Sequence, residues 1–379
     1  MTGVRPHRSD PIRAVSVVAG LAVGACLTWN VSNVGAVADP LADHYGVSLA
    51  AVGLLTTALF VTHLAVQLPA GRGADRFGSQ RIALGAVAAA IVGNGLLLVD
   101  GGFELALVGR AVVGMGSGAA FVAGLDLVRA GGGGASVQGL YGGATMAGGG
   151  LALMLVPPLT DATSWRAAYW SAALLALLAA VPTLMASGIP RVGHVGDWVL
   201  RDRALLPIGV LQAATFGLAV IAGNWVVPLL EHQGVSSTAA GLVGGLVLFV
   251  GIFARPVGGL LAGRVSGRLL VAVALVGTSV GALLLALGGP LALSALGALV
   301  LGLTAGVPFA VIFAAAQRTR PDAPGGAIAL VNACAVLTIL VGTPLAGLAF
   351  ELPSEGRLAF AVIAILGAAA LLPLRVARL

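Results

Sequence analysis

The chain of 379 residues is dominated by apolar side chains, with 59% hydrophobic residues, 9% charged residues and a mean hydropathy of +1.05. A soluble domain carries about 25% charged residues, so this composition excludes an ordinary soluble protein and indicates a membrane protein. The net charge of +6 comes from 20 arginines, because the chain has no lysine. These arginines are spread over short segments between apolar stretches, which is typical of membrane topology and not of a nucleic-acid-binding surface.

Twelve apolar segments follow one another along the chain, and each is long enough to cross a bilayer. A membrane-spanning helix needs about 20 mostly apolar residues, and bundled helices tolerate glycine or proline within them. Six spans are expected first, at residues 14–38, 49–70, 82–99, 104–128, 137–158 and 166–188. Six more are expected at residues 205–230, 237–262, 269–288, 291–316, 325–350 and 357–376. The sequence therefore predicts an all-α membrane protein with twelve transmembrane helices.

Arginine is distributed unevenly between the two sides of this arrangement. Most arginines fall in loops on one side: Arg5, Arg8, Arg13, Arg72, Arg76, Arg81, Arg129, Arg191, Arg201, Arg203, Arg264, Arg268, Arg318, Arg320, Arg375 and Arg378. The loops on the other side are acidic, with Arg166 and Arg357 as their only arginines. Because short arginine-rich loops stay in the cytoplasm, we expect an integral protein of a bacterial plasma (inner) membrane with both termini in the cytoplasm.

The two groups of six spans are related by an internal repeat. Pro40 recurs as Pro228, an offset of 188 residues, and the tripeptide Gly-Val-Ser at 46–48 recurs at 234–236 in the same register. Duplicated membrane halves form a substrate site between them in many secondary transporters. We therefore expect two pseudo-symmetric six-helix bundles. Their boundaries are a first half at residues 1–190, a cytoplasmic linker at 191–204 and a second half at 205–379.

The segment between the second and third spans carries a recognisable motif. Residues 71–81 read Gly-Arg-Gly-Ala-Asp-Arg-Phe-Gly-Ser-Gln-Arg. This resembles the signature loop of the major facilitator superfamily, in which a Gly, three residues, Asp, Arg, any residue and a Gly precede basic residues. The glycines permit a tight reversal of the chain. The Asp75 carboxylate can latch two helices together, against either a helix N-terminus or an arginine, so Asp75, Arg76 and Arg81 are candidate gating residues.

This loop departs from the family pattern in two places. Ser79 and Gln80 stand where the family favours basic residues, and Arg81 can substitute for them. In the second half, the repeat places Gly263 at the position equivalent to Asp75. A charged latch is therefore expected in the first half alone.

Further motifs extend the resemblance over essentially the whole chain. Residues 110–118 resemble the superfamily's second motif, Arg-x3-Gly-x-Gly-x-Gly, and Ser164-Trp165-Arg166 resembles the Trp-Arg that opens the sixth span of many members. The resemblance implies the major facilitator fold and a secondary transporter that binds a small-molecule substrate. It implies no enzyme activity and no cofactor. Cys26 and Cys334 fall within predicted spans, so neither a disulfide framework nor a metal site is expected.

Two segments resemble the nitrate/nitrite porter and cyanate-permease branch of the superfamily, residues 67–78 and 253–259. In those porters, an arginine on span two and an arginine on span eight hold the anion together. Arg255 matches the second of these, whereas Gln67 occupies the place of the first, and the porters' glycine signature on span eleven is absent. These two departures count against a strict nitrate porter. The resemblance implies a relative that carries a nitrate-, nitrite- or cyanate-like ion or a small organic anion.

Ionisable groups within spans are costly, so each is a candidate functional residue. Arg255 is expected to bind substrate, although an arginine there can also snorkel to the membrane surface or pair structurally. Arg110 is expected to serve coupling or structure. His63 lies one turn from Gln67 on the same helix face; it can couple protons or line the pocket, or be a hydrogen-bonded core histidine.

Neutral polar residues complete the candidate substrate site. Each alone is more often a packing hydrogen bond, but on these spans some are expected to face substrate: Asn30, Asn33, Tyr141, Asn224 and Asn332. Asn94 and Gln212 are assigned to helix packing.

Other functions stay open at this stage. Drug exporters of this superfamily usually carry an acid deep within a span, whereas here the only acid away from a clear span boundary is Asp126, one turn from the end of span four. The lack of a deeply placed acid, together with the two arginines within spans, favours an anionic substrate. The alternative is a proton-coupled exporter of drugs or metabolites, and a non-transporting membrane sensor is a third class. We expect a monomer in contact with lipid, without nucleic acid as a partner.

Overall fold

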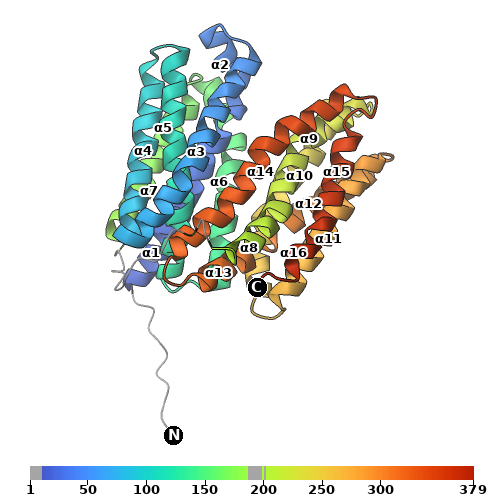
Figure 1. The fold of residues 1–379 in the computed structure, drawn as a ribbon. Coiled ribbons are helices and arrows are strands. Elements are labelled where there is room, and N and C mark those ends of the chain that lie inside the picture. The colour runs from blue at the N-terminus through green and yellow to red at the C-terminus, as the bar shows by residue number, and fades with distance from the viewer. Residues whose placement is uncertain (1–10, 187–198, 200–201) are drawn as a thin grey trace.

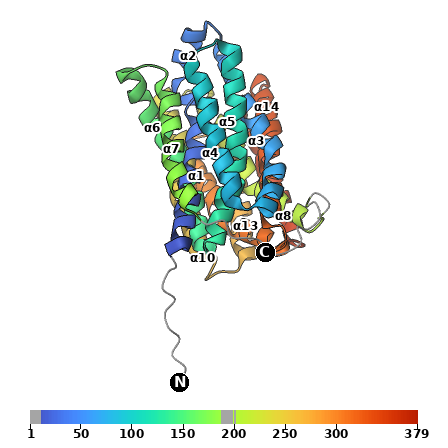
Figure 2. The same ribbon diagram turned by 90° about the vertical axis from the view of Figure 1, so that its left-hand side faces the viewer.

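The structure is a computed structural model that describes residues 11–186, 199 and 202–379. Within these residues every regular element is a helix, and twelve of the helical segments are long and apolar enough to cross a membrane. The helices form two bundles that stand side by side (Figure 1). Figure 2 shows the first bundle in front, with its helices running nearly parallel to one another. The expectation of an all-α protein with two six-helix halves is confirmed.

The first half contains six long helices and a short one. Their bounds are α1 (Pro11–Ser32), α2 (Ala38–Tyr45), α3 (Leu49–Phe77), α4 (Ser79–Val99), α5 (Phe103–Ala130), α6 (Ala135–Ala162) and α7 (Ala167–Met185), with a 3-10 turn η1 (Gly35–Val37) before α2. The first span thus ends at Ser32, six residues earlier than predicted, and α2 follows it as a separate helix. Residues 71–77, predicted as a loop, are the last two turns of α3. The reversal is made at Gly78 alone, whose φ of 91° is accessible to glycine.

The second half repeats this arrangement with interruptions. Its elements are α8 (Leu205–Gln212), η3 (Ala213–Gly217), α9 (Leu218–His232), α10 (Ser237–Leu261), α11 (Gly267–Leu287), α12 (Leu291–Gly306), α13 (Phe309–Thr319), α14 (Pro324–Leu348), η4 (Ala349–Glu351), α15 (Arg357–Ala369) and α16 (Leu371–Leu374). Span seven contains the π-helical turn η3, and span ten is broken before Phe309 by Pro308, which has no amide hydrogen to donate.

The internal repeat reappears in the contacts. Ser48 caps α3 through Ala51, and Ser236, 188 residues later, caps α10 through Ala239. Gly93 on α4 packs against the carbonyl of Gly109 on α5, and their counterparts Gly281 and Gly297 pack together in the same way. The same helix caps and the same glycine contacts between helices therefore occur in both halves.

The two halves meet at one end of the molecule. We call this the arginine-rich end; α3 and α5 end there, α4 and α6 begin there, and it carries Arg76, Arg81, Arg264 and Arg318. At this end Gly71 packs against Gly325 and Ala329, and Gly139 packs against Gly259. In Figure 1 the bundles approach at this end and diverge toward the end that carries α2. The contacts therefore close the arginine-rich end.

Candidate functional site

A pocket lies beside the helix that carries Arg255. It has a volume of about 90 Å³ and is lined by residues of η3, α9, α10 and α12 in the second half, together with Met146 of α6 in the first. A water molecule needs roughly 10–15 Å³ of such space, so the pocket accommodates a small ligand of a few heavy atoms. Arg255 and Asn224 both line it, and the structure therefore brings together two of the residues predicted to bind substrate.

Arg255 projects from the second half into the first. Its side chain is 2% exposed, and Nη1 donates to the carbonyl of Gly142 at 3.1 Å and to Oγ1 of Thr145 at 2.7 Å. The guanidinium lies 5.0 Å from the ring centre of Phe216 and 4.5 Å from that of Phe309, within cation–π range. Both hydrogen-bond acceptors are neutral, so these contacts hold the cation without cancelling its charge.

No carboxylate forms an ion pair with Arg255 in the part of the chain that the structure describes. Its Nε and Nη2 atoms donate no hydrogen bond to those residues either. Nη2 of Arg110, by contrast, is enclosed without a hydrogen-bond partner, whereas Arg255 lines a pocket. Arg255 therefore offers a pocket one positive charge and one free edge of its guanidinium.

Small residues on the facing helix make room for this arginine. A Cβ atom at Gly142 would lie 2.7 Å from Cδ of Arg255 and 2.8 Å from Cδ1 of Phe309. Phe216 reaches the guanidinium from η3, and such π-turns are frequent at functional sites. Gly142, Phe216 and Phe309 are not among the residues predicted from the sequence. Their residue types alone do not indicate a binding role, because glycine and phenylalanine also pack these helices together elsewhere.

Gln67 does not line the pocket with Arg255. It is fully buried on α3, and neither Nε2 nor Oε1 has a hydrogen-bond partner. It lies one turn from Gly71, which packs on α14. Asn332, two turns along α14 from Gly325, is also buried and makes no hydrogen bond with the described residues. Gln67 thus lies at the α3–α14 junction, the pseudo-symmetric counterpart of the α6–α10 junction that holds Arg255.

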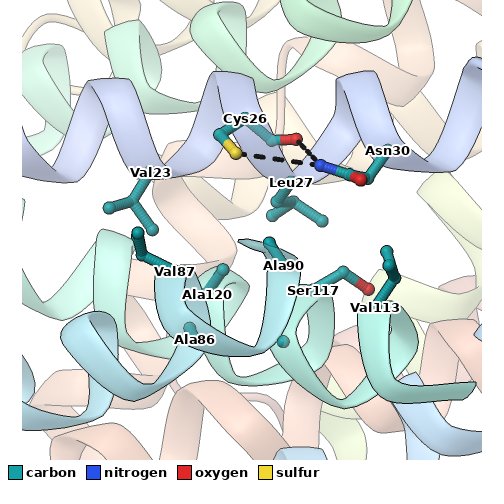
Figure 3. A pocket seen from close by; sticks show the side chains of 11 residues that line it. Val23, Cys26, Leu27, Asn30, Ala86, Val87, Ala90, Val113, Ser117 and Ala120 are labelled. Carbon is teal, nitrogen blue, oxygen red and sulfur yellow. Dashed lines mark hydrogen bonds between the residues drawn. The ribbon is translucent and has the colours of Figure 1, made fainter. Parts of the chain in front are cut away.

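Other candidates on the first half turn inward, away from the second half. His63 Nδ1 lies 2.7 Å from Oγ of Ser117 on α5. Asn30 donates to the carbonyl of Cys26 and accepts from Asn94 Nδ2 at 2.7 Å. Figure 3 shows Cys26, Asn30 and Ser117 around a gap of about 10 Å³ between α1, α4 and α5. That volume is at the limit for a single water molecule, so these contacts favour the packing interpretation of His63 and Asn30.

Arg110 lies wholly within the first half. Its Nη1 donates to Oδ1 of Asn33 at 3.3 Å and its Nε donates to the carbonyl of Leu55. Asn33 in turn donates to the carbonyl of Ala168 at 2.7 Å. Tyr141 donates its hydroxyl to the carbonyl of Phe121. These hydrogen bonds join helices of one bundle, which favours a structural role for all three residues.

The Asp75 carboxylate reaches the other half. It is 2% exposed and accepts hydrogen bonds from the backbone nitrogens of Gly325 at 2.8 Å and Gly326 at 2.7 Å, in the first turn of α14. A helix N-terminus carries unpaired N–H groups and a partial positive charge. Of the two partners left open by the sequence, the helix N-terminus is therefore a partner of Asp75.

The neighbouring motif residues serve the first half itself. Gln80 donates to the carbonyls of Thr183 and Leu184 at the end of α7, and Ser79 donates to the Asp126 carboxylate. Both neutral side chains thus join helices within the first half. Arg76 and Arg81 are exposed, and neither forms a hydrogen bond or ion pair with the described residues.

The Trp-Arg motif lies at the opposite end. Arg166 pairs with Asp100 at 2.8 Å, and Asp100 also contacts His44 Nε2 at 2.7 Å. The Trp165 ring stacks on His44 with ring centres 4.2 Å apart. Burial, and then the Asp100 carboxylate, raise the pKa of Tyr45 to about 12. This cluster ties α2 to two neighbouring loops and lies apart from the Arg255 pocket.

Comparison with known proteins agrees with this architecture. The sequence profile of the Major Facilitator Superfamily matches residues 18–207 and 205–378. A probable nitrate transporter, NarT of Staphylococcus epidermidis, is 25% identical over 185 residues, which is 48% of this chain and 48% of that protein. The alignment thus spans about half the length of this curated relative.

Solved structures share the fold at low sequence identity. The fucose:proton symporter FucP of E. coli has a TM-score of 0.73 at 16% identity, covering 95% of this chain and 98% of its own. The human organic anion transporter MFSD10 has a TM-score of 0.75 at 17% identity, covering 96% of this chain and 100% of its own. The chain is therefore a member of the major facilitator superfamily, an integral membrane transporter and not an enzyme.

Proposed function

We propose that this transporter moves a small monovalent anion across the membrane by alternating access, and that Arg255 binds the anion. The observation that carries the proposal is the state of this arginine: it is buried, it faces a pocket, and no described carboxylate neutralises it. An uncompensated buried charge costs several kcal/mol. An anion in the pocket recovers part of that cost when it binds, whereas a cation adds to it.

The size of the pocket limits the substrate. About 90 Å³ suits an ion of a few heavy atoms, such as nitrate, nitrite, cyanate or a small carboxylate. One guanidinium supplies a single positive charge, which matches one negative charge better than two. The likeness to a protein named a probable nitrate transporter supports the same class of substrate.

Rocking of the two halves supplies the access. We propose that residues 1–190 move against residues 205–379 about the segment 191–204, most of which lies outside the described residues. The arginine-rich end is assigned to the cytoplasm because of its arginines. With that end closed, we propose that this conformation is the outward-facing one, and that the transporter is a monomer in a bacterial plasma membrane. The Asp75 latch and the Arg255 contacts are then the interactions that inward opening has to break.

An uptake screen with purified protein in proteoliposomes tests this function. The panel contains nitrate, nitrite, cyanate, formate, acetate and one cationic dye, each measured with and without a pH gradient. Saturable uptake of at least one anion, with no uptake of the dye, is expected. Transport of the dye alone, driven by the pH gradient, would support the proton-coupled exporter instead.

A further inference from the structure

Arg255 and Thr145 belong to different halves of the molecule. Nη1 of Arg255, on α10, donates to the Thr145 hydroxyl and to the Gly142 carbonyl, both on α6. Nη1 carries two hydrogens, and these two acceptors account for both. The orientation of the second half's cation is therefore set by the first half.

Thr145 is itself held firmly. It is 1% exposed, its hydroxyl donates to the Gly142 carbonyl at 2.7 Å, and its own carbonyl accepts a hydrogen bond from the Thr28 hydroxyl on α1. The hydroxyl can still accept from Arg255, because a threonine oxygen has one hydrogen and two lone pairs. Thr145 thus forms a fixed acceptor, anchored by α1 and α6, against which Arg255 is placed.

Because Nη1 is already hydrogen-bonded, only one edge of the guanidinium can still bind an anion through two N–H groups. A guanidinium binds forked oxyanions through two parallel N–H groups. With Nη1 engaged, the free pair is Nε and Nη2, which donate to none of the described residues. This edge fits two oxygens carried by one atom, as in nitrate, nitrite or a carboxylate. A halide offers a single sphere and gains little from such an edge.

We propose that Thr145 is the positioning residue that turns the Nε/Nη2 edge of Arg255 toward the pocket and so selects forked oxyanions over spherical anions. The inference rests on the proposed function. Because the Arg255–Thr145 contact crosses between the halves, it exists only while the arginine-rich ends are together. When the halves separate there, Arg255 loses this support, and its affinity for the oxyanion falls on the side to which the anion is released.

Kinetic comparison of three variants tests the proposal. Nitrate uptake and its inhibition by bromide are measured in proteoliposomes for Thr145→Val, Thr145→Ser and the control Thr183→Val. Thr183 is also a fully buried threonine, but its hydroxyl bonds only to a carbonyl one turn earlier in its own helix. Thr145→Val is expected to raise the KM for nitrate about tenfold or more, because the cation loses a charge-assisted hydrogen bond, with kcat within about twofold.

The ionic preference separates positioning from a general loss of stability. In Thr145→Val the preference for nitrate over bromide is expected to fall by the same factor as the rise in KM, whereas Thr145→Ser and Thr183→Val keep the wild-type values. An unchanged KM and preference in Thr145→Val would overturn the inference, and so would a Thr145→Ser variant as impaired as the valine one. Should the valine variant not fold, Thr145→Ala carries the same comparison.

The proposed function fails in a different way. If wild-type protein takes up no anion, the anion function and this inference both fall. If wild-type protein takes up nitrate and Arg255→Ala does not, while Thr145→Val behaves as wild type, then the function stands and only the positioning role is overturned.

Discussion

The carboxylate of Asp75 accepts a hydrogen bond from the backbone nitrogen of Gly325 at 2.8 Å, so the first half of the molecule caps a helix of the second. Pro324 begins α14, and the N–H groups of its first turn have no partner within the helix. The bond can persist only while the two halves touch at the arginine-rich end. Under the proposed rocking mechanism, Asp75 stabilises the conformation in which the arginine-rich end is closed.

Asp75→Asn is expected to shift the balance toward the conformation in which the arginine-rich end is open. Hydrogen bonds to a charged group contribute about 1.5–3 kcal/mol and an amide keeps part of that, so a loss of roughly 1–2 kcal/mol corresponds to a five- to thirtyfold change in population. The distance between spin labels at Gly134→Cys and Arg318→Cys, both exposed at that end, reports the shift. Asp161→Asn, an exposed acid at the other end, is the control. An unchanged distance distribution in Asp75→Asn would contradict the latch.

Gly263→Asp is expected to create a second latch. The repeat relates Gly263 to Asp75, and the N-terminus of α6 has no side-chain cap. A Cβ at Gly263 would come no closer than 3.9 Å to its nearest neighbour, the Leu260 carbonyl oxygen. The added carboxylate, worth about 0.3–1 kcal/mol at a helix N-terminus, should favour the closed arginine-rich end and slow transport. The same spin-label pair measures it, and Gly263→Asn is the uncharged control. A faster transport rate or a larger open fraction would show that the symmetry argument fails.

Gly142→Ala is expected to impair anion binding, whereas Gly150→Ala on the same helix is not. The added methyl at position 142 would collide with the Arg255 and Phe309 side chains, while at position 150 the nearest atom is 3.8 Å away. Displacing Arg255 should raise the KM for nitrate by about tenfold, since about 1.4 kcal/mol of lost binding is enough for that change. Uptake kinetics in proteoliposomes measure it. Equal KM values for the two variants would mean that the position of Arg255 does not matter.

The membrane orientation is tested by labelling single cysteines in a protein that carries Cys26→Ala and Cys334→Ala. Arg81→Cys and Arg318→Cys are expected to react with an impermeant thiol reagent only from the cytoplasmic side, and Asp161→Cys only from outside. All three positions are exposed. Labelling of Arg81→Cys or Arg318→Cys in intact cells would reverse or overturn the arrangement inferred from the arginines.

Much of the fold follows from local sequence rules. The Ser48 and Ser236 caps and the paired glycine contacts at Gly93 and Gly281 repeat because the same residues recur at one offset. Apolar length predicts the twelve spans, although it placed the end of the first span too late. The π-turn before α9 had no sequence signal, because alanine, threonine, phenylalanine and glycine also occur throughout the regular helices of this chain.

The candidate site was only partly predictable. Arg255 could be found because an arginine within a span is costly whatever its neighbours. A neutral polar residue within a span costs much less, so its presence alone does not indicate a function. Helix periodicity predicts which face of the helix it lies on but not which neighbouring helix packs against that face. His63 therefore lies against Ser117, and Asn30 against Asn94. The proposed role of Thr145 depends on the crossing of α6 and α10, which only the tertiary structure provides.

The central claim is that Arg255 binds the transported anion, and nitrate uptake by the Arg255→Ala protein tests it most directly. Arg264→Ala, which removes an exposed arginine near the end of the same helix, is the matched control. With equal amounts of folded protein in the liposomes, Arg255→Ala is expected to lose nitrate uptake, Arg255→Lys to retain a weak remnant because it keeps the charge without the fork, and Arg264→Ala to transport as wild type. Nitrate uptake by Arg255→Ala at the wild-type rate would contradict the account.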